Sequence, residues 1–286
     1  MSTVDDIIRG ALEEDAPWGD LTSEVFLPAE ARATAALVAR EPGVFSGAGV
    51  FARVFELVDP DTRVMSLVRD GERFEVDTVL ARVEGSARAV LRAERIALNL
   101  TQRMSGIATL TARYVEAVVG TSARVVDTRK TTPGLRILER QAVRDGGGHN
   151  HRFSLSDAVL AKDNHLAVLT AAGMPIGDAI RAARERIGHT THLEVEVDRL
   201  DQIEAVVAAG VDTIMLDNFT PVQLREGVAL VAGRALVEAS GGVSLDTVTE
   251  IAATGVDVIS VGALTHSPRA LDLGLDVEVR GVEVRA

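Results

Sequence analysis

The chain has 286 residues, a formal charge of −12 and a hydrophobic fraction of 47%. Its length fits one large or two ordinary domains around a sizeable apolar core. The absence of cysteine excludes disulfides, thiolate metal sites and a cysteine nucleophile, and the net acidity argues against broad nucleic-acid binding.

The N-terminal stretch and the apolar runs of the sequence do not suggest export or membrane insertion. The N-terminal stretch "MSTVDDIIRG" is acidic and amphipathic, which is not the pattern of a signal peptide. No uncharged apolar run approaches the roughly 18 residues that a membrane span requires. We therefore expect a cytoplasmic enzyme without a membrane partner.

The first hundred residues differ in pattern from the rest. Segments 33–49 and 64–87 contain strand-like runs broken by glycine-containing turns, and 88–120 is a long helical stretch. These elements predict an N-terminal domain of mixed helices and strands. The alternating tail 271–286 predicts an edge strand that packs on this first domain.

The second half alternates strands and helices. Apolar strands are predicted at 123–128, 157–164, 192–198, 211–218, 235–240 and 256–263, and helices at 135–147, 176–188, 200–210, 221–232 and 245–254. This alternation predicts parallel strands joined by right-handed crossovers. A closed barrel and an open doubly wound sheet share the pattern. We favour a barrel because no G-x-G-x-x-G follows the first strand and polar residues recur at strand ends.

Those polar strand ends predict where a site lies. The carboxyl ends of barrel strands meet at one mouth. The side chains expected to face one cavity there are Arg129, Lys130, Lys162, Asp163, Glu196, Asp217, Ser240 and Gly262.

Positive charge is concentrated near this mouth. Between Arg124 and Arg152 there are seven Lys or Arg against three Asp or Glu, and the only two lysines of the chain are Lys130 and Lys162. Planar arginine suits carboxylate or phosphate, and lysine acts as a compact point charge. An anionic small molecule is the expected ligand.

Other mouth residues leave alternatives open. Glu196 and Asp217 suit Mg²⁺ or sugar hydroxyls, or simply pair with a neighbouring lysine. The small segments "EASGG" and "SVGA", each expected just before a helix, suit phosphate binding by backbone amides. His149 and His151 could lie in a flexible surface loop, or they could bind zinc as a pair, although no third ligand is clear. We favour a third possibility for His151, beside Arg152: that it donates a hydrogen bond to an anionic substrate.

The combined motifs resemble the quinolinate phosphoribosyltransferase family. They are "TRKTTPGLR", "GGGHNHRFSLSDAVLAKDNH", "EVEVD", "LDNF", "EASGG" and "VGALTHS", in this order, together with "ALEEDAPWGDLTS" and "AERIALNLTQRMSGIAT". The similarity extends over about residues 11 to 276. Departures are small: Ala161 stands where the family usually has isoleucine, and Ala239 replaces a common serine.

The resemblance implies an α/β fold with an N-terminal α/β sandwich domain at 1–106, on which the tail 269–286 packs, and an incomplete α/β, TIM-like barrel at 107–268. It also implies a homodimer, or a larger assembly, in which Arg95 completes the partner's site. Mg²⁺ is expected on the pyrophosphate of the second substrate, with Glu196 and Asp217 as candidate protein ligands.

The resemblance further implies two substrate sites and decarboxylation to nicotinate mononucleotide in NAD biosynthesis. Quinolinate would be bound by Arg95, Thr128, Arg129, His151, Arg152 and Lys162. Phosphoribosyl pyrophosphate would be bound by Lys130, Glu196, Asp217, Ser240, Gly241, Gly242, Gly262, Ala263 and Leu264, and the expected catalytic residues are Lys130, Glu196 and Asp217.

Three other functions compete with this one. A relative that acts on another substrate would tend to lack the lysine of "KDNH", which this chain has as Lys162. A non-enzymatic metabolite sensor would not require cations and acids together. The third is a barrel phosphatase or aldolase, in which a lysine could form a Schiff base, but Arg129 and Asp163 flank the two lysines and do not suggest a desolvated amine.

Overall fold

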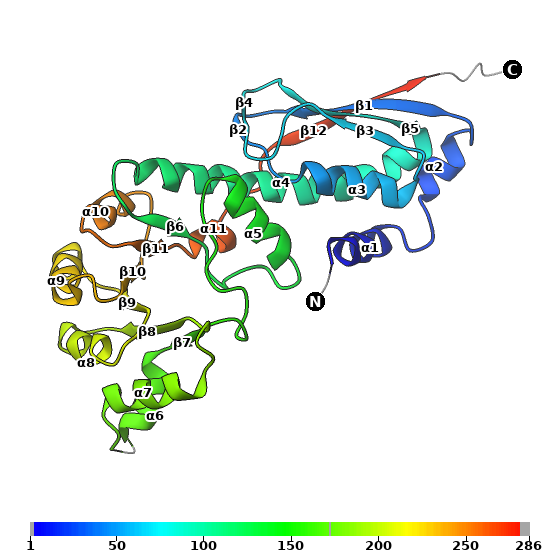
Figure 1. The fold of residues 1–286 in the computed structure, drawn as a ribbon. Coiled ribbons are helices and arrows are strands. Elements are labelled where there is room, and N and C mark those ends of the chain that lie inside the picture. The colour runs from blue at the N-terminus through cyan, green and yellow to red at the C-terminus, as the bar shows by residue number, and fades with distance from the viewer. Residues whose placement is uncertain (1–2, 172, 281–286) are drawn as a thin grey trace, which may run out of the picture. The chain divides into compact units, whose positions relative to one another are not determined.

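The computed structural model describes residues 3–171 and 173–280, which divide into two compact units (Figure 1). Within these residues, the first unit comprises the chain up to Ala112, Thr131–Gly147 and the chain from Thr265 onward. The second comprises Arg113–Lys130 and Gly148–Leu264. The sequence predicted a domain boundary after residue 106, with residues 131–147 in the barrel domain. In the structure, the contacts place residues 131–147 in the first unit instead.

The first unit is built on a four-stranded antiparallel sheet in the order β12-β1-β5-β3. Its strands are β1 (Arg32–Ala39), β3 (Arg63–Ser66), β5 (Val79–Ser86) and β12 (Leu273–Arg280). The C-terminal strand β12 pairs with β1 over its full length. The last residues of the expected tail, 281–286, lie outside the described residues.

Helices and a small second sheet complete this unit. They are α1 (Val4–Asp15), α2 (Leu21–Phe26), α3 (Ala48–Val58), and the pair β2 (Gly43–Val44) and β4 (Arg73–Phe74). On α3, Phe51 and Phe55 are fully buried with ring centroids 5.0 Å apart. On β1, Ala33, Ala35 and Leu37 alternate into the core, as period-two patterning predicts for a strand with one buried face.

Buried polar contacts explain why α5 (Arg136–Asp145) belongs to the first unit. The long helix α4 (Ala87–Ala117) carries Arg103, whose Nε donates to Glu139 Oε1 on α5 at 2.7 Å. Asp145 accepts a 2.6 Å hydrogen bond from the Ser46 hydroxyl, and burial raises the pKa of this carboxyl. A helical period alone does not show which unit a helix joins, because that depends on its partners.

Two glycine-to-alanine changes should have opposite effects on stability. A Cβ at Gly106 on α4 would lie 2.1 Å from the Arg269 carbonyl oxygen, so Gly106→Ala should cost about 1–3 kcal/mol. A Cβ at Gly10 on α1 would meet nothing within 4 Å, and Gly10→Ala should stabilise by up to ~1 kcal/mol. Urea denaturation of both variants measures the two effects; equal effects would contradict the close approach at Gly106.

The second unit is a six-stranded parallel sheet in the order β6-β11-β10-β9-β8-β7. The strands are β6 (Arg124–Val126), β7 (Val159–Ala161), β8 (Leu193–Val197), β9 (Thr213–Asp217), β10 (Leu236–Ser240) and β11 (Val258–Ser260). Each falls within a predicted strand. Fully buried side chains such as Val195, Ile214 and Ile259 occupy the strand centres, as expected for strands covered on both faces.

This sheet is an incomplete barrel. The first strand β6 pairs with the last, β11, and not with β7. At the free edge of β6, a single parallel bridge joins Val126 to His149. The prediction of an incomplete barrel is thus confirmed, and residues around His149 lie where a closed barrel would have another strand.

Helices flank these strands; those within 176–188, 200–210, 221–232 and 245–254 were predicted, whereas those at 163–171 and 263–266 were not. They are α6 (Asp163–Ala171), α7 (Ile176–Arg186), α8 (Ile203–Val207) after the 3-10 turn η1 (Leu200–Gln202), α9 (Pro221–Val231), α10 (Val248–Ala252) and the single turn α11 (Ala263–His266). Figure 1 shows α8, α9 and α10 along one side of the sheet, where they contact β9, β10 and β11 respectively. Among the described residues, no helix combines the length and apolar composition needed to cross a bilayer.

Candidate active site

A cavity of about 550 Å³ lies at the carboxyl ends of the second unit's strands. All of its lining residues belong to that unit. Those expected from the sequence are Thr128, Arg129, Lys130, His151, Arg152, Lys162, Glu196, Asp217, Ser240, Gly241 and Gly242, and they are joined by Leu160, Met215, Asn218, Glu238 and Ser260. The predicted basic, acidic and glycine-rich strand ends therefore meet in one cavity.

The buried carboxylate of Asp127 organises the basic side of this cavity. Asp127 directly follows β6 and is fully buried. Its Oδ1 accepts the His151 amide at 2.8 Å, and its Oδ2 accepts the Asn150 side-chain amide at 2.6 Å. The segment that carries His151 and Arg152 is thereby tied to the loop that carries Thr128–Lys130, although about twenty residues separate them in sequence.

Two guanidinium groups meet in the cavity. Arg152 donates to the Ala158 carbonyl at 3.0 Å. Burial and then the positive charge of Arg129 lower the pKa of Arg152. Like charges gathered in a partly buried cavity disfavour each other, and a bound anion would remove that penalty. The electrostatics therefore favour an anionic ligand between Arg129 and Arg152.

The imidazole of His151 contacts two buried carboxylates. Its Nε2 lies 3.1 Å from Glu194 Oε2 and 3.5 Å from Glu238 Oε2, and its Nδ1 accepts the Arg152 amide at 2.7 Å. Burial alone would lower the pKa of His151, but the hydrogen bonds and charges of both glutamates outweigh it and raise the pKa to about 10. Burial also raises the pKa of Glu194.

We call His151, Glu194 and Glu238 the His–Glu cluster. Their ligand-type atoms lie within 4.8 Å of one another, which is close enough for a metal. His149 does not belong to the cluster, and its side chain is exposed. The histidine pair considered for zinc is therefore not brought together around one point.

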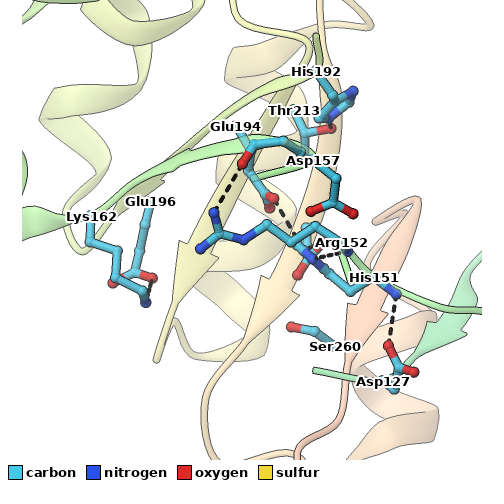
Figure 2. Close-up of polar contacts among 12 residues, drawn as sticks. Asp127, His151, Arg152, Asp157, Lys162, His192, Glu194, Glu196, Thr213 and Ser260 are labelled. Carbon is cyan, nitrogen blue, oxygen red and sulfur yellow. Dashed lines mark hydrogen bonds and ion pairs between the residues drawn. The ribbon is translucent and has the colours of Figure 1, made fainter. Parts of the chain in front are cut away.

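The acidic side of the cavity contains one ion pair. Lys162 Nζ lies 2.5 Å from Glu196 Oε2 (Figure 2), so this lysine is a paired ammonium and unsuited to Schiff-base chemistry. Asp217, at the end of β9, accepts the Asn218 side-chain amide at 2.7 Å. Its half-buried carboxylate offers the hard oxygen ligands that Mg²⁺ prefers, whereas one oxygen of Glu196 is already engaged.

A close backbone approach joins the ends of β9 and β10. The Asn218 amide donates to the Ser240 carbonyl at 2.8 Å, and Gly241 has φ +89°. A Cβ on Gly241 would lie 2.2 Å from Asn218 Oδ1, so this position requires glycine. The expectation that "EASGG" directly precedes a helix is wrong, because α10 begins only at Val248.

Four predicted ligands do not line this cavity. Gly262, Ala263 and Leu264 lie at or before the single turn α11, and Leu264 is fully buried, which leaves only backbone groups for a ligand. Arg95 is exposed on α4 in the first unit. The side chain of Asp163 lies outside the described residues.

Sequence reasoning missed Asp127, Glu194 and Glu238 as functional residues. Each is a buried acidic residue in or directly after a strand, and each lies within two positions of a residue that was predicted to face the mouth. Side chains two apart on a strand share a face, so Glu194 lies one layer below Glu196, and Glu238 one layer below Ser240. Glutamates are almost never fully buried unless they are paired, so a glutamate in an apolar strand could have marked both positions.

Loss of the Asp127 carboxylate should destabilise the chain measurably. Asp127→Ala leaves two partly buried donors without their acceptor, so the free energy of unfolding should fall by about 2–4 kcal/mol. Denaturant titration measures the change. Asp61→Ala, at an exposed turn residue, is the matched control and should stay within about 0.5 kcal/mol. A similar small change at Asp127 would show that the segment is held by other contacts.

Comparison with known proteins agrees with this arrangement. Residues 20–105 match the N-terminal domain, and residues 107–276 the C-terminal domain, of quinolinate phosphoribosyl transferase. The chain is 46% identical to nicotinate-nucleotide pyrophosphorylase [carboxylating] of Mycobacterium leprae, over 95% of this chain and 96% of that protein. It is 42% identical to the probable enzyme of that name from Bacillus subtilis, over 95% and 92%.

Solved structures show the same fold. The crystal structure of NadC from Streptococcus pyogenes covers 97% of both chains with a TM-score of 0.92 and 40% identity. Nicotinate-nucleotide pyrophosphorylase from Ehrlichia chaffeensis matches with a TM-score of 0.90 and 36% identity, over 97% of this chain and 99% of that one. These matches, together with the barrel, define a phosphoribosyltransferase. The chain belongs to the quinolinate phosphoribosyltransferase family.

Proposed function

We propose that this chain transfers the phosphoribosyl group of phosphoribosyl pyrophosphate to quinolinate. The products are nicotinate mononucleotide, pyrophosphate and CO₂, a step of NAD biosynthesis. The observation that carries the proposal is the single cavity in which cations, acids and a glycine-rich loop meet. One group of its residues suits a planar dicarboxylate, and the other suits a charged sugar phosphate.

Quinolinate fits the basic side of the cavity. Arg129 and Arg152 offer planar guanidinium groups that bind carboxylates in bidentate fashion, with Thr128, His151 and Lys162 beside them. The two carboxylates would offset the burial and the repulsion from Arg129 that lower the pKa of Arg152. Nicotinate has one carboxylate fewer and so loses one charge-assisted contact, which contributes ~3 kcal/mol of binding free energy. It should therefore bind about 100-fold more weakly than quinolinate.

Calorimetric titration measures this difference between the two pyridine acids. Quinolinate should bind the wild-type chain, and nicotinate should show little or no heat at the same concentrations. Equal affinities for the two acids would contradict the assignment of the basic side to a dicarboxylate.

Phosphoribosyl pyrophosphate fits the acidic and glycine-rich side. Lys130 supplies a compact charge for phosphate oxygens, and Ser240–Gly242 line the same cavity at the end of β10. Asp217, with Glu196 as a second candidate, would hold Mg²⁺ together with the pyrophosphate. Bound there, Mg²⁺ would neutralise negative charge on the leaving pyrophosphate. The backbone of Gly262–Leu264 remains a candidate for the 5′-phosphate.

The chemistry follows from this placement. The pyridine nitrogen forms a bond to ribose C1 as the bond from C1 to pyrophosphate breaks. Positive charge develops on the sugar, where the carboxylates of Glu196 and Asp217 stabilise it, and Lys130 offsets charge on the departing oxygen. The ring nitrogen becomes cationic, which stabilises the electron pair left at C2 when CO₂ departs. The protein positions two anions and needs no covalent nucleophile.

We infer further that the functional assembly is a homodimer or a multiple of it. Large apolar side chains are exposed on and before α2: Trp18 at 95%, Leu21 at 74%, Val25 at 69% and Phe26 at 78%. An apolar patch of this kind favours burial against a second protein surface. Arg95, exposed in the same unit, would then reach the partner's quinolinate site.

Mixed dimers test this shared site. Arg95→Ala and Arg152→Ala chains should each be nearly inactive alone. When mixed dimers form, some sites regain both arginines, so activity should recover to a fraction of that of the wild type. Demonstrated mixed dimers without recovery would contradict a site shared between chains.

A further inference from the structure

Asn218 has an unusual backbone conformation in the mouth cavity. It directly follows Asp217, the last residue of β9, and both residues line the cavity. Its φ is +58°, in the left-handed region, which only two other described non-glycine residues, Asp77 and Ala232, adopt. Asparagine tolerates this region better than most side chains do. The strand β9 therefore ends in a sharp turn directly after a residue assigned to the phosphoribosyl donor.

Contacts with the end of β10 fix this turn. The Asn218 backbone amide donates to the Ser240 carbonyl at 2.8 Å, where Asp217 and Ser240 are paired on neighbouring parallel strands. A Cβ on Gly241 would lie 2.2 Å from Asn218 Oδ1 and 2.6 Å from its Cγ. The side chain of Asn218 therefore lies against the backbone of Gly241, and this contact limits its rotation.

The side-chain amide of Asn218 orients the Asp217 carboxylate without neutralising it. Asn218 Nδ2 donates to Asp217 Oδ2 at 2.7 Å, and Asp217 has no ion pair among the described residues. Glu196, the other acid of the mouth, is instead paired with the ammonium of Lys162. An amide donor carries no charge, so Asp217 keeps its full negative charge for a cation, whereas that of Glu196 is already offset.

A fixed carboxylate is what the proposed substrate requires. Mg²⁺ demands near-octahedral coordination, usually from one or two carboxylates together with substrate phosphates. Hydrogen bonds that orient a ligating carboxylate contribute to metal affinity, and their loss typically weakens binding about 10- to 100-fold. Because Asn218 engages Oδ2 of Asp217, the other carboxylate oxygen, Oδ1, is left to the cation in a defined orientation.

We propose that Asn218 is a positioning residue, which holds the Asp217 carboxylate in the orientation that binds the Mg²⁺ complex of phosphoribosyl pyrophosphate. This inference rests on the proposed function. Asn218 acts through Asp217, so loss of its side chain should weaken binding of the phosphoribosyl donor. The affinity for quinolinate should not change, because quinolinate is assigned to the basic side of the cavity.

Calorimetric titration of Asn218→Gly tests the proposal. Glycine adopts a left-handed φ without strain, so this variant removes the side chain and keeps the turn. The Kd of phosphoribosyl pyrophosphate in the presence of Mg²⁺ should rise about 10- to 100-fold, and the Kd of quinolinate should stay within about twofold. Ala232→Gly is the matched control, since Ala232 is an exposed left-handed residue at the end of α9, and it should keep both wild-type Kd values.

A double-mutant cycle shows whether Asn218 acts through Asp217. In an Asp217→Asn background, Asn218→Gly should change the Kd of the phosphoribosyl donor by no more than about twofold. An equal loss in both backgrounds, an equal loss of quinolinate affinity, or wild-type affinity in Asn218→Gly would overturn the proposal.

A second variant keeps the test decisive if Asn218→Gly does not fold. Asn218→Asp retains the shape of the side chain but not its donor, so it must then show the same selective loss of affinity for the phosphoribosyl donor. Failure of the wild type to bind phosphoribosyl pyrophosphate with Mg²⁺ would instead refute the proposed function.

Discussion

Replacement of Arg152 by alanine should lower kcat/KM for quinolinate about a thousandfold. Arg152 lines the mouth cavity and is held in place by the Ala158 carbonyl and the Asp127-bound segment. A bidentate guanidinium–carboxylate contact comprises two charge-assisted hydrogen bonds, worth together ~4 kcal/mol. KM for phosphoribosyl pyrophosphate should change little, because the loss is confined to the basic side.

Steady-state kinetics with each substrate varied in turn measures both effects. Arg181→Ala is the matched control, since Arg181 is exposed on α7 and pairs locally with Asp178. It should stay within about twofold of the wild type. An Arg152→Ala chain with wild-type kinetics toward quinolinate would remove this residue from the substrate site.

Lys162→Ala should lower kcat/KM for quinolinate about 100-fold, because one charged contact in a partly buried site contributes ~3 kcal/mol of binding free energy. The loss has two sources. A substrate carboxylate loses its cation, and Glu196, whose side chain is only 12% exposed, loses its partner. An unpaired carboxylate beside an anionic substrate adds repulsion.

A double-mutant cycle separates the two sources. Glu196→Gln removes the acid alone, and the double variant removes the pair. If the ion pair is coupled in the active enzyme, the double variant should be less impaired than the two single losses multiplied together. Strict multiplication would show that Lys162 and Glu196 act independently once substrates are bound.

Most of the barrel could be predicted from the sequence because its signals are local. Apolar runs of strand length alternate with helical periods, and each run ends in polar residues at the mouth. The predicted strand at 211–218, for example, contains β9 (Thr213–Asp217), with Asp217 in the cavity. Parallel strands align their carboxyl ends, so topology alone brings such residues together.

Other features depend on contacts between distant segments. The partners of α5 are Arg103 and Ser46, and no local pattern identifies them. The helices α1, α2 and α3 were not assigned, because short amphipathic segments among strands give weak signals. The prediction that the barrel is incomplete, with β6 and β7 unpaired, rested on the family resemblance. The alternation of strands and helices does not show whether a sheet closes.

In the candidate site, too, single residues could be predicted from the sequence, but contacts between distant segments could not. The individual cations and acids at strand ends were predicted, but their pairing was not. The two lysines were assigned to separate substrates, Lys162 to quinolinate and Lys130 to phosphoribosyl pyrophosphate. The ion pair of Lys162 with Glu196 links these two sides instead. The His–Glu cluster needed three segments, around residues 151, 194 and 238, that only the folded sheet brings together.

The most direct test of the central claim is a product assay with the purified wild-type chain. Incubated with quinolinate, phosphoribosyl pyrophosphate and Mg²⁺, it should form nicotinate mononucleotide, pyrophosphate and CO₂ in equal amounts, and removal of Mg²⁺ by a chelator should stop the reaction. Nicotinate in place of quinolinate should give no product. Absence of nicotinate mononucleotide with quinolinate, or equal turnover of nicotinate, would contradict the proposed function.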